Sequence, residues 1–529
     1  MKKINKFIAC LAMLVLIFTS CEADLDQYNH NDRNITQDQL EVDFQHVGSK
    51  YKPIFESIYQ YSPAWSYQLQ QNLNADVYSG YMTNPRPFVA GANNTTYALV
   101  AGWNNFIWSV PYGNVMNNVK SIVDNTKDDY PTLYAVSLIL KVEAMHRVSD
   151  VFGPIVYTNF GDTGDNKGKY DSQQEAYNAF FADLDTAVAA LTADINSQRF
   201  AAFDMSYGGD YHKWVKLANS LRLRMAIRIS MADPAKAKTE GEKALSQAEG
   251  LITDNGDGFF VNGTLAHPLS VIDNSWGDIR MNASMESILS GYGDDRMAAY
   301  FNPSDANGGA YKGVRNGLPL LPGYSDELAQ KAAYVGFSNM NDGVKTSKVQ
   351  LMTAAEVYFL QAEAALRGWT GAGNAQAHYE MGITTSFGQH GVGGAAAYVA
   401  DNTSVPANYV DPVNASNSIN AMSTITVAWD NAATNEQKLE RIITQKWIAM
   451  FPEGQEAWSE YRRTGYPKIF PVVSNQSGGI IDTNLQIRRI PFVTSEHSTN
   501  ESNVVNAVTL LGGADNGGTR LWWDTGSNF

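Results

Sequence analysis

The side chains that most often bind metals are scattered along this 529-residue chain. No two of the eight histidines lie within ten residues of each other, so no helix carries a closely spaced pair of zinc ligands. The acidic loop at residues 254–257 offers oxygen ligands for calcium, but it lacks the alternating acids and the late glutamate of an EF-hand. The spacing of these residues favours a protein without a bound metal or other cofactor. It does not decide whether a calcium ion binds at the acidic loop.

Residues for catalysis also lack a recognisable arrangement. The sequence contains neither the nucleophile elbow G-x-S-x-G nor a phosphate-binding loop. Carboxylates are plentiful, and the two carboxylates of a glycosidase are close in space but not in sequence. A surface glycoside hydrolase with a carboxylate pair in a cleft therefore stays an alternative, while the motifs favour a protein that is not an enzyme.

The overall composition narrows the function further. Acidic residues outnumber basic ones by 54 to 39, which gives a net charge of −15 and argues against a nucleic-acid binder. A mean hydropathy of −0.28 excludes a polytopic membrane protein. Only two cysteines are present, too few for a disulfide framework. Aromatic residues reach 11%, and rings that cannot all be buried are candidates for ligand contacts.

The first twenty residues have the pattern of a secretory signal. Three lysines precede an apolar run from Phe7 to Phe18, which is too short to span about 30 Å of hydrocarbon as a helix. Thr19, Ser20 and Cys21 follow and resemble the lipobox of bacterial lipoproteins, although Phe18 replaces the usual Leu, Val or Ile. We expect residues 1–20 to be removed and Cys21 to be acylated.

The residues after Cys21 are acidic and then polar. In Bacteroidetes-type lipoproteins an acidic start such as residues 22–26 resembles the signal for export to the outer face of the outer membrane. The acyl chains would anchor the protein stably in a membrane. We expect residues 21–40 to form a tether and residues 41–529 to form a single unit at the cell exterior.

Capping residues and apolar stripes predict a series of helices. Proline at the first helical position and capping boxes of the type Ser/Thr-x-x-Glu/Gln mark most of their starts. One helix is expected to run from the Asp233-Pro234 start through Leu251. The other starts or stripes are at Pro131, Ser172, residues 214–225, Thr353, the segment after Gly373, Thr434 and residues 457–461.

Two of these helices share a pattern of small residues, at 237–245 and 375–383. Small residues at fixed spacing allow antiparallel helices to approach closely, as in tetratricopeptide hairpins. Residues 252–345 and 389–433 are instead rich in Gly, Asn, Asp and Ser, with little periodicity. The fold class expected is mostly α, with tetratricopeptide-like helical hairpins and large loop-rich insertions near 252–345 and 389–433.

Several segments, spread over most of the chain, resemble the SusD/RagB family of surface nutrient-binding lipoproteins, in its second, SusD-like branch. The most specific is QKWIAM at 445–450, followed by EAWSEYRRTGYP at 456–467. The helical tryptophans in these segments are expected to be core residues, and Arg462 and Arg463 to pair within the fold. The other matching segments are at 141–157, 209–225, 352–363, 489–496 and 521–524.

The resemblance implies a function in nutrient capture. Family members are mostly helical lids on TonB-dependent SusC-like transporters in the outer membrane, and they capture glycans or in some cases peptides. The implied function is non-catalytic capture of extracellular oligosaccharides and their delivery to a SusC-like transporter. A peptide-capturing lid and a helical-repeat envelope scaffold are further alternatives. The sequence indicates neither the glycan nor the residues that contact the transporter.

A glycan site of this kind requires a shallow surface of aromatic rings. Rings in segments without helical periodicity are the candidates, because helical rings are more easily assigned to the core. By analogy with the family, ligand contacts are expected in early and middle loops. The predicted ligand-binding residues are Trp65, Tyr67, Tyr78, Tyr81, Trp276, Tyr292 and Tyr324.

Overall fold

The computed structural model describes residues 44–263, 266–346 and 348–529. The predictions for the signal peptide, for the tether and for Cys21 concern residues outside this range. Among the helices of the described residues, none combines the length and the apolar character needed to cross a bilayer. Contacts divide the chain into residues 1–49 and residues 50–529. In the first unit the structure describes the short helix α4 (Gln45–Gly48).

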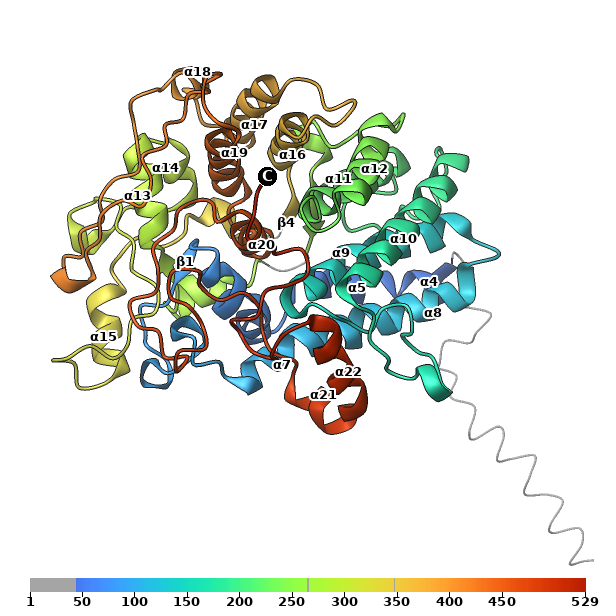
Figure 1. The fold of residues 1–529 in the computed structure, drawn as a ribbon, viewed down its shortest axis with the longest axis horizontal. Helices are drawn as coiled ribbons and strands as arrows, with labels where there is room; N and C mark the ends of the chain where they lie inside the picture. Colours follow the sequence, from blue (N-terminus) through green and yellow to red (C-terminus); the bar gives the residue numbers. More distant parts are fainter. Residues whose placement is uncertain (1–43, 264–265, 347) are drawn as a thin grey trace, which may run out of the picture. The chain divides into compact units, whose positions relative to one another are not determined.

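The second unit is mostly helical, as predicted (Figure 1). Its first half contains α5 (Tyr51–Ile58), α6 (Ala64–Tyr67), α7 (Ala101–Val110), α8 (Asn117–Thr126), α9 (Pro131–Phe152), α10 (Gln173–Ala193), α11 (Tyr211–Arg228) and α12 (Pro234–Ser246). Its second half contains α13 (Ala283–Tyr292), α14 (Arg296–Tyr300), α15 (Glu327–Tyr334), α16 (Ala354–Leu366), α17 (Ala375–Gln389), α18 (Ala395–Val399), α19 (Asn435–Met450), α20 (Gly454–Thr464), α21 (Thr494–Thr499) and α22 (Glu501–Leu511).

Helical hairpins form the scaffold. Helix α9 packs on α10, α11 on α12, and α16 on α17, while α10–α11, α11–α16 and α16–α19 contacts join the pairs. Figure 1 shows this succession, from the blue-green helices α9–α12 to α16, α17 and α19. The predicted capping boxes at Ser172 and Thr434 are present, and their side chains accept hydrogen bonds from the backbone at Glu175 and Gln437. These helix starts are therefore confirmed.

The end of α12 differs from the prediction. The helix starts at Pro234, as expected, but ends at Ser246 and not at Leu251. Asn219 of α11 explains the earlier end, because its side-chain amide donates to Gln247 Oε1 and to the carbonyl of Gly250. These bonds hold residues 247–250 as a turn against α11 instead of a further helical turn.

Two glycines show why small residues recur in the second helices of two hairpins. A Cβ atom on Gly382 of α17 would lie 2.8 Å from the ring of Phe359 in α16. A Cβ on Gly241 of α12 would lie 2.1 Å from the ring of Trp369. Any larger side chain would force the packed ring away. The pattern therefore reflects close packing at both positions.

A buried ionic network ties four helices together. Arg224 of α11 donates two hydrogen bonds to Glu356 of α16, at 2.8 and 2.7 Å. Arg228 donates to Glu460 of α20 at 2.6 Å. Each guanidinium faces further carboxylates as well, and removal of a member would upset the balance of buried charge. The network's main members are Arg224, Arg228, Lys446, Glu356, Glu456 and Glu460.

Strands are few and short. Strand β1 (Met82–Thr83) pairs antiparallel with β3 (Arg280–Met281), and β2 (Phe259–Asn262) pairs antiparallel with β4 (Lys348–Met352). The loop-rich regions also carry the short helices α13, α14, α15 and α18. Pairing of β1 with β3 brings the early loops beside the middle loops, the two regions in which ligand contacts were predicted.

Candidate functional site

Partly exposed aromatic rings from three segments meet on one surface. Trp65 of α6 is 48% exposed, and its ring meets Phe106 of α7 edge-on, with centroids 5.3 Å apart. Trp103 lies one turn before Phe106 on α7 and meets Phe88 edge-on at 6.3 Å. We call these four residues, Trp65, Phe88, Trp103 and Phe106, the aromatic surface. All four keep part of their ring accessible to solvent.

Trp276 directly follows a segment that contacts the helix of Trp65. Asp278 accepts a hydrogen bond from the side chain of Gln68 at 3.4 Å. It also forms an ion pair with Lys331 of α15 at 3.1 Å. Gln68 is three residues from Trp65, and the segment η8 (Val271–Ser275) contacts α6. The structure thus brings the segments of Trp65 and Trp276 together.

A charged pair lies at the edge of the aromatic surface. The guanidinium of Arg86 lies 4.8 Å from the ring centroid of Phe88, and its Nε is 3.1 Å from Glu327 Oε2 in α15. Glu327 also accepts a hydrogen bond from the backbone of Ala90 at 2.7 Å. Both charged side chains are partly exposed. Their remaining donor and acceptor positions suit the hydroxyl groups of a sugar.

A buried polar framework holds α6 in place behind these rings. It is built on η2 (Gln68–Asp76), a π-helical segment that continues directly from α6. Asp76 accepts hydrogen bonds from Tyr67 at 3.0 Å, from Gln71 at 3.0 Å and from Asn72 at 3.1 Å. Burial raises the pKa of Asp76 to about 6, and the three hydrogen bonds oppose this shift.

The seven predicted site residues separate into two groups. Trp65 is half-exposed, Trp276 is partly exposed, and Tyr324 is partly buried against an apolar cluster that includes Leu321 and Tyr334. Their rings remain accessible to a ligand. The other four residues, Tyr67, Tyr78, Tyr81 and Tyr292, are buried.

These four buried tyrosines require a correction, because a buried ring offers no face to a sugar. Their hydroxyl groups donate to acceptors within the fold, which are Asp76 for Tyr67, the carbonyl of Asn94 for Tyr78, the carbonyl of Trp447 for Tyr81 and the carbonyl of Ile425 for Tyr292. The rings of Tyr78 and Tyr81 also pack on the core tryptophans Trp458 and Trp447, at 5.1 and 5.0 Å. Burial raises the pKa of each phenol. All four are core residues.

Phe88, Trp103 and Phe106 were not predicted from the sequence. The spacing of Trp103 and Phe106 does carry a signal, since residues three apart share one face of a helix. The spacing alone does not show whether this face is exposed, because Asn104 between the two rings is buried.

Comparison with known proteins shows which family has this architecture. The family model described as SusD-like, "Susd and RagB outer membrane lipoprotein", matches residues 27–524. The chain belongs to the SusD/RagB family. Its members are outer-membrane lipoproteins, so the predicted family and fold are both confirmed. No curated protein matches the chain significantly.

Solved structures of SusD homologues agree with this assignment. A chitin-binding SusD homologue from Flavobacterium johnsoniae is 51% identical, with a TM-score of 0.88, and the match covers 91% of this chain and 99% of that one. A SusD homologue from Bacteroides vulgatus is 39% identical, with a TM-score of 0.86 and coverage of 92% and 100%. A SusD-like protein from Bacteroides thetaiotaomicron is 33% identical, with a TM-score of 0.84 and coverage of 90% and 98%.

Proposed function

We propose that this SusD-family protein captures extracellular oligosaccharides on the aromatic surface and delivers them, without catalysis, to a TonB-dependent SusC-like transporter. The observation that carries the proposal is the aromatic surface itself, together with the contact between α6 and the segment that precedes Trp276. Ring faces stack on the apolar faces of sugars, and the adjacent Arg86 and Glu327 can bind hydroxyl groups. Tyr324 is a further candidate contact, because it precedes the helix that carries Glu327.

We propose chitin-type oligosaccharides as the first ligands to test. The support is the homologue from Flavobacterium johnsoniae, which is described as chitin-binding and is 51% identical over nearly its whole length. Three or four rings at about 0.5–1.5 kcal/mol each beyond the burial of their surface, less the cost of ordering a flexible chain, give weak binding. We expect dissociation constants between about 1 μM and 1 mM.

The buried positions of two carboxyls with raised pKa values support a role without catalysis. A pKa near 6 or 7 is typical of a catalytic acid, and burial gives Asp76 a value of about 6 and Glu143 a value of about 7. Asp76, however, is surrounded by Tyr67, Gln71 and Asn72, and Glu143 is buried in the core near Arg224. Neither carboxyl can reach a bound glycan, so a glycosidase is disfavoured.

Calorimetry on the soluble residues 41–529 tests the proposal. Titration with chitotetraose and chitohexaose should give saturable binding, and chromatography of the mixture should return both ligands unhydrolysed. Hydrolysis would support the glycosidase alternative. Binding of peptides but not of any glycan in a panel would support a peptide-capturing lid, and absence of any ligand would support an envelope scaffold.

The location and the partner are tested in cells. We expect the wild-type protein to be acylated at Cys21, to fractionate with the outer membrane and to be accessible to protease added outside. Cys21→Ala should release it from the membrane, and unchanged membrane association would contradict the lipid anchor. Mild detergent extraction should co-purify a large β-barrel transporter, and repeated failure to recover one would count against the partnership.

A further inference from the structure

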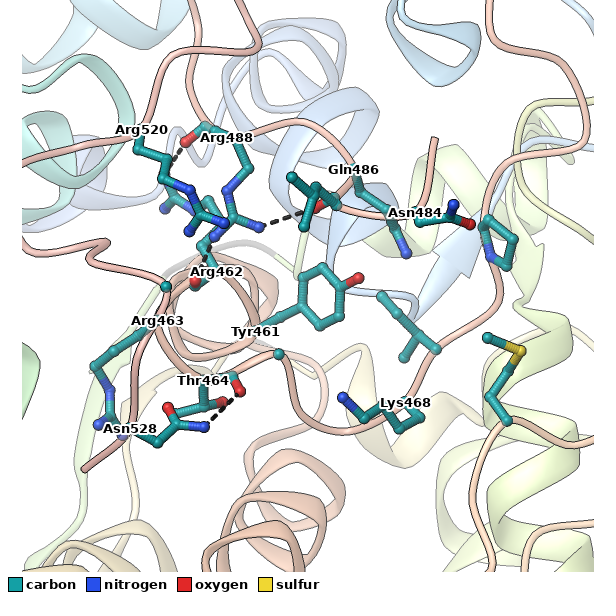
Figure 2. A pocket seen from close by; sticks show the side chains of 16 residues that line it. Tyr461, Arg462, Arg463, Thr464, Lys468, Asn484, Gln486, Arg488, Arg520 and Asn528 are labelled. Carbon is teal, nitrogen blue, oxygen red and sulfur yellow. Dashed lines mark hydrogen bonds between the residues drawn. The ribbon is translucent and has the colours of Figure 1, made fainter. Parts of the chain in front are cut away.

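A cavity lies in the C-terminal part of the unit (Figure 2). Its volume is about 300 Å³, and its walls come from the last turn of α20, the loop that follows it, residues 484–488 and the C-terminal segment 520–528. It shares no residue with the aromatic surface or with Trp276 and Tyr324. Any ligand of this cavity is therefore additional to the proposed glycan site.

The cavity wall has only one sign of charge. Five basic side chains and no carboxylate are among its lining residues, in a protein whose net charge is −15. A concave site lined by one sign of charge concentrates ions of the opposite sign. The basic lining residues are Arg462, Arg463, Lys468, Arg488 and Arg520.

Carboxylates behind the wall compensate only part of this charge. Arg463 is fully paired, because its two Nη atoms lie 2.7 and 2.6 Å from Glu363 and Glu460. A single carboxylate, Asp524, serves two guanidinium groups, those of Arg488 at 2.6 Å and Arg520 at 2.5 Å. This shared carboxylate leaves one positive charge of that group uncompensated.

Arg462 adds a buried charge that has no carboxylate in hydrogen-bond contact among the residues that the structure describes. Its guanidinium lies 3.6 Å from the centroid of the Trp458 ring and donates to the carbonyls of Asp150 and Arg488 at 2.5 and 2.9 Å, and to Ser459 Oγ at 3.0 Å. Burial lowers the pKa of Arg462 to about 9; the charge of Arg488 acts in the same direction, and the carboxylates of Asp150 and Asp524 oppose it only in part. An anion in the cavity would reduce this electrostatic cost.

Two of the cations are accessible to a ligand. Lys468 is exposed, and its ammonium lies 4.3 Å from the ring of Tyr466 with no ion pair within the described part of the chain. The side chain of Arg520 is 37% exposed. Figure 2 shows Lys468 below the ring of Tyr461, with the amide side chains of Gln486 and Asn484 above and beside it. Amides and a phenol add neutral hydrogen-bond donors to the positive wall.

We propose that this cavity binds a small oxyanion, a carboxylate or phosphate group carried by a molecule no larger than about one sugar unit. The size follows from the volume, which is at the lower limit of ordinary ligand pockets. The sign follows from the wall, and the direct contacts are Lys468 and Arg520. Either inorganic phosphate or an acidic sugar would supply this chemistry.

Calorimetry at low ionic strength with inorganic phosphate, glucuronate and glucose tests the proposal on residues 41–529. At least one of the two anions should bind, and glucose should not. Lys468→Gln should weaken anion binding roughly tenfold, as expected for loss of one charged hydrogen bond. Arg520→Gln should have a similar effect. Lys127→Gln, the same change at an exposed lysine at the end of α8, is the matched control and should leave binding unchanged.

Each outcome either supports the proposal or overturns it. Binding of glucuronate alone identifies an acidic sugar as the ligand, while binding of phosphate, with or without glucuronate, identifies a general oxyanion site. No anion binding, equal binding of glucose, or equal weakening by Lys468→Gln and Lys127→Gln would overturn it. Trp65→Ala should leave anion binding unchanged, so failure of the glycan proposal is distinguishable from failure of this one. Circular dichroism checks that each variant is folded.

Discussion

Removal of the Trp65 ring should weaken glycan binding without unfolding the protein. A tryptophan side chain offers up to about 250 Å² of surface. Since Trp65 is 48% exposed, roughly 120 Å² is accessible, and we assume that a stacked sugar covers about two-thirds of this area, about 80 Å². At about 25 cal/mol per Å² the lost burial is about 2 kcal/mol. The dissociation constant of Trp65→Ala should therefore rise about thirtyfold.

The effect on stability should be smaller, because half of the ring is already in water. Loss of the edge-on contact with Phe106 should cost about 1 kcal/mol of the free energy of unfolding. Phe529 is an aromatic control with the same exposed fraction of 48%, located beside Arg367 after α16. Calorimetry should show weaker binding for Trp65→Ala and for Trp276→Ala but not for Phe529→Ala. Unchanged binding in both tryptophan variants would refute this placement of the site.

Three further predictions concern the core. Burial raises the pKa of Glu143 from 4.5 to about 7. Its contribution to the free energy of unfolding is therefore lost as pH rises from about 4.5 to 7, by roughly 3 kcal/mol. Between pH 5 and 8, denaturant unfolding should show that the stability of Glu143→Gln increases relative to that of the parent protein. Burial lowers the pKa of His146 from 6.5 to about 3, so its contribution to the free energy of unfolding is lost as pH falls from about 6.5 to 3. Urea unfolding at pH 7 and pH 4 should show a smaller loss of stability for His146→Gln than for the parent protein. Gly241→Ala should lower the free energy of unfolding by about 1–3 kcal/mol through a clash with Trp369. Gly102→Ala is the control and should not, because the space around its Cβ position is open. Equal thermal midpoints for the two variants would contradict the close packing at Gly241.

Most of the helical scaffold was predictable because its signals are local. Proline at Pro131 and the capping boxes at Ser172 and Thr434 mark helix starts through contacts within four residues. The end of α12 was not predictable in this way, since it depends on Asn219 in another helix. The ionic network was also hidden, because its basic and acidic members come from helices far apart in the sequence.

The candidate site was only partly predictable. Trp65 and Tyr67 are two residues apart in one short helix, yet one ring is half-exposed and the other is buried. The difference comes from tertiary partners: Tyr67 reaches Asp76 on the following π-helical segment and stacks with Tyr59 at 5.3 Å. Absence of periodicity identified segments outside the main helices but could not identify which rings face solvent. The exposure of each ring depends on contacts made after folding.

The framework that holds η2 in place does not depend on the indole of Trp65. The hydrogen bonds that fix η2 end on Asp76, Gln71 and Asn72, and none of them involves the indole of Trp65. If the surface binds glycans as proposed, a substitution at Trp65 changes a ligand contact and leaves the framework intact. New sugar preferences can be selected by exchanging one outward side chain at a time, while the rest of the protein stays an unchanged scaffold. A library randomised at Trp65, Trp103 and Phe106 would sample those preferences on a single scaffold.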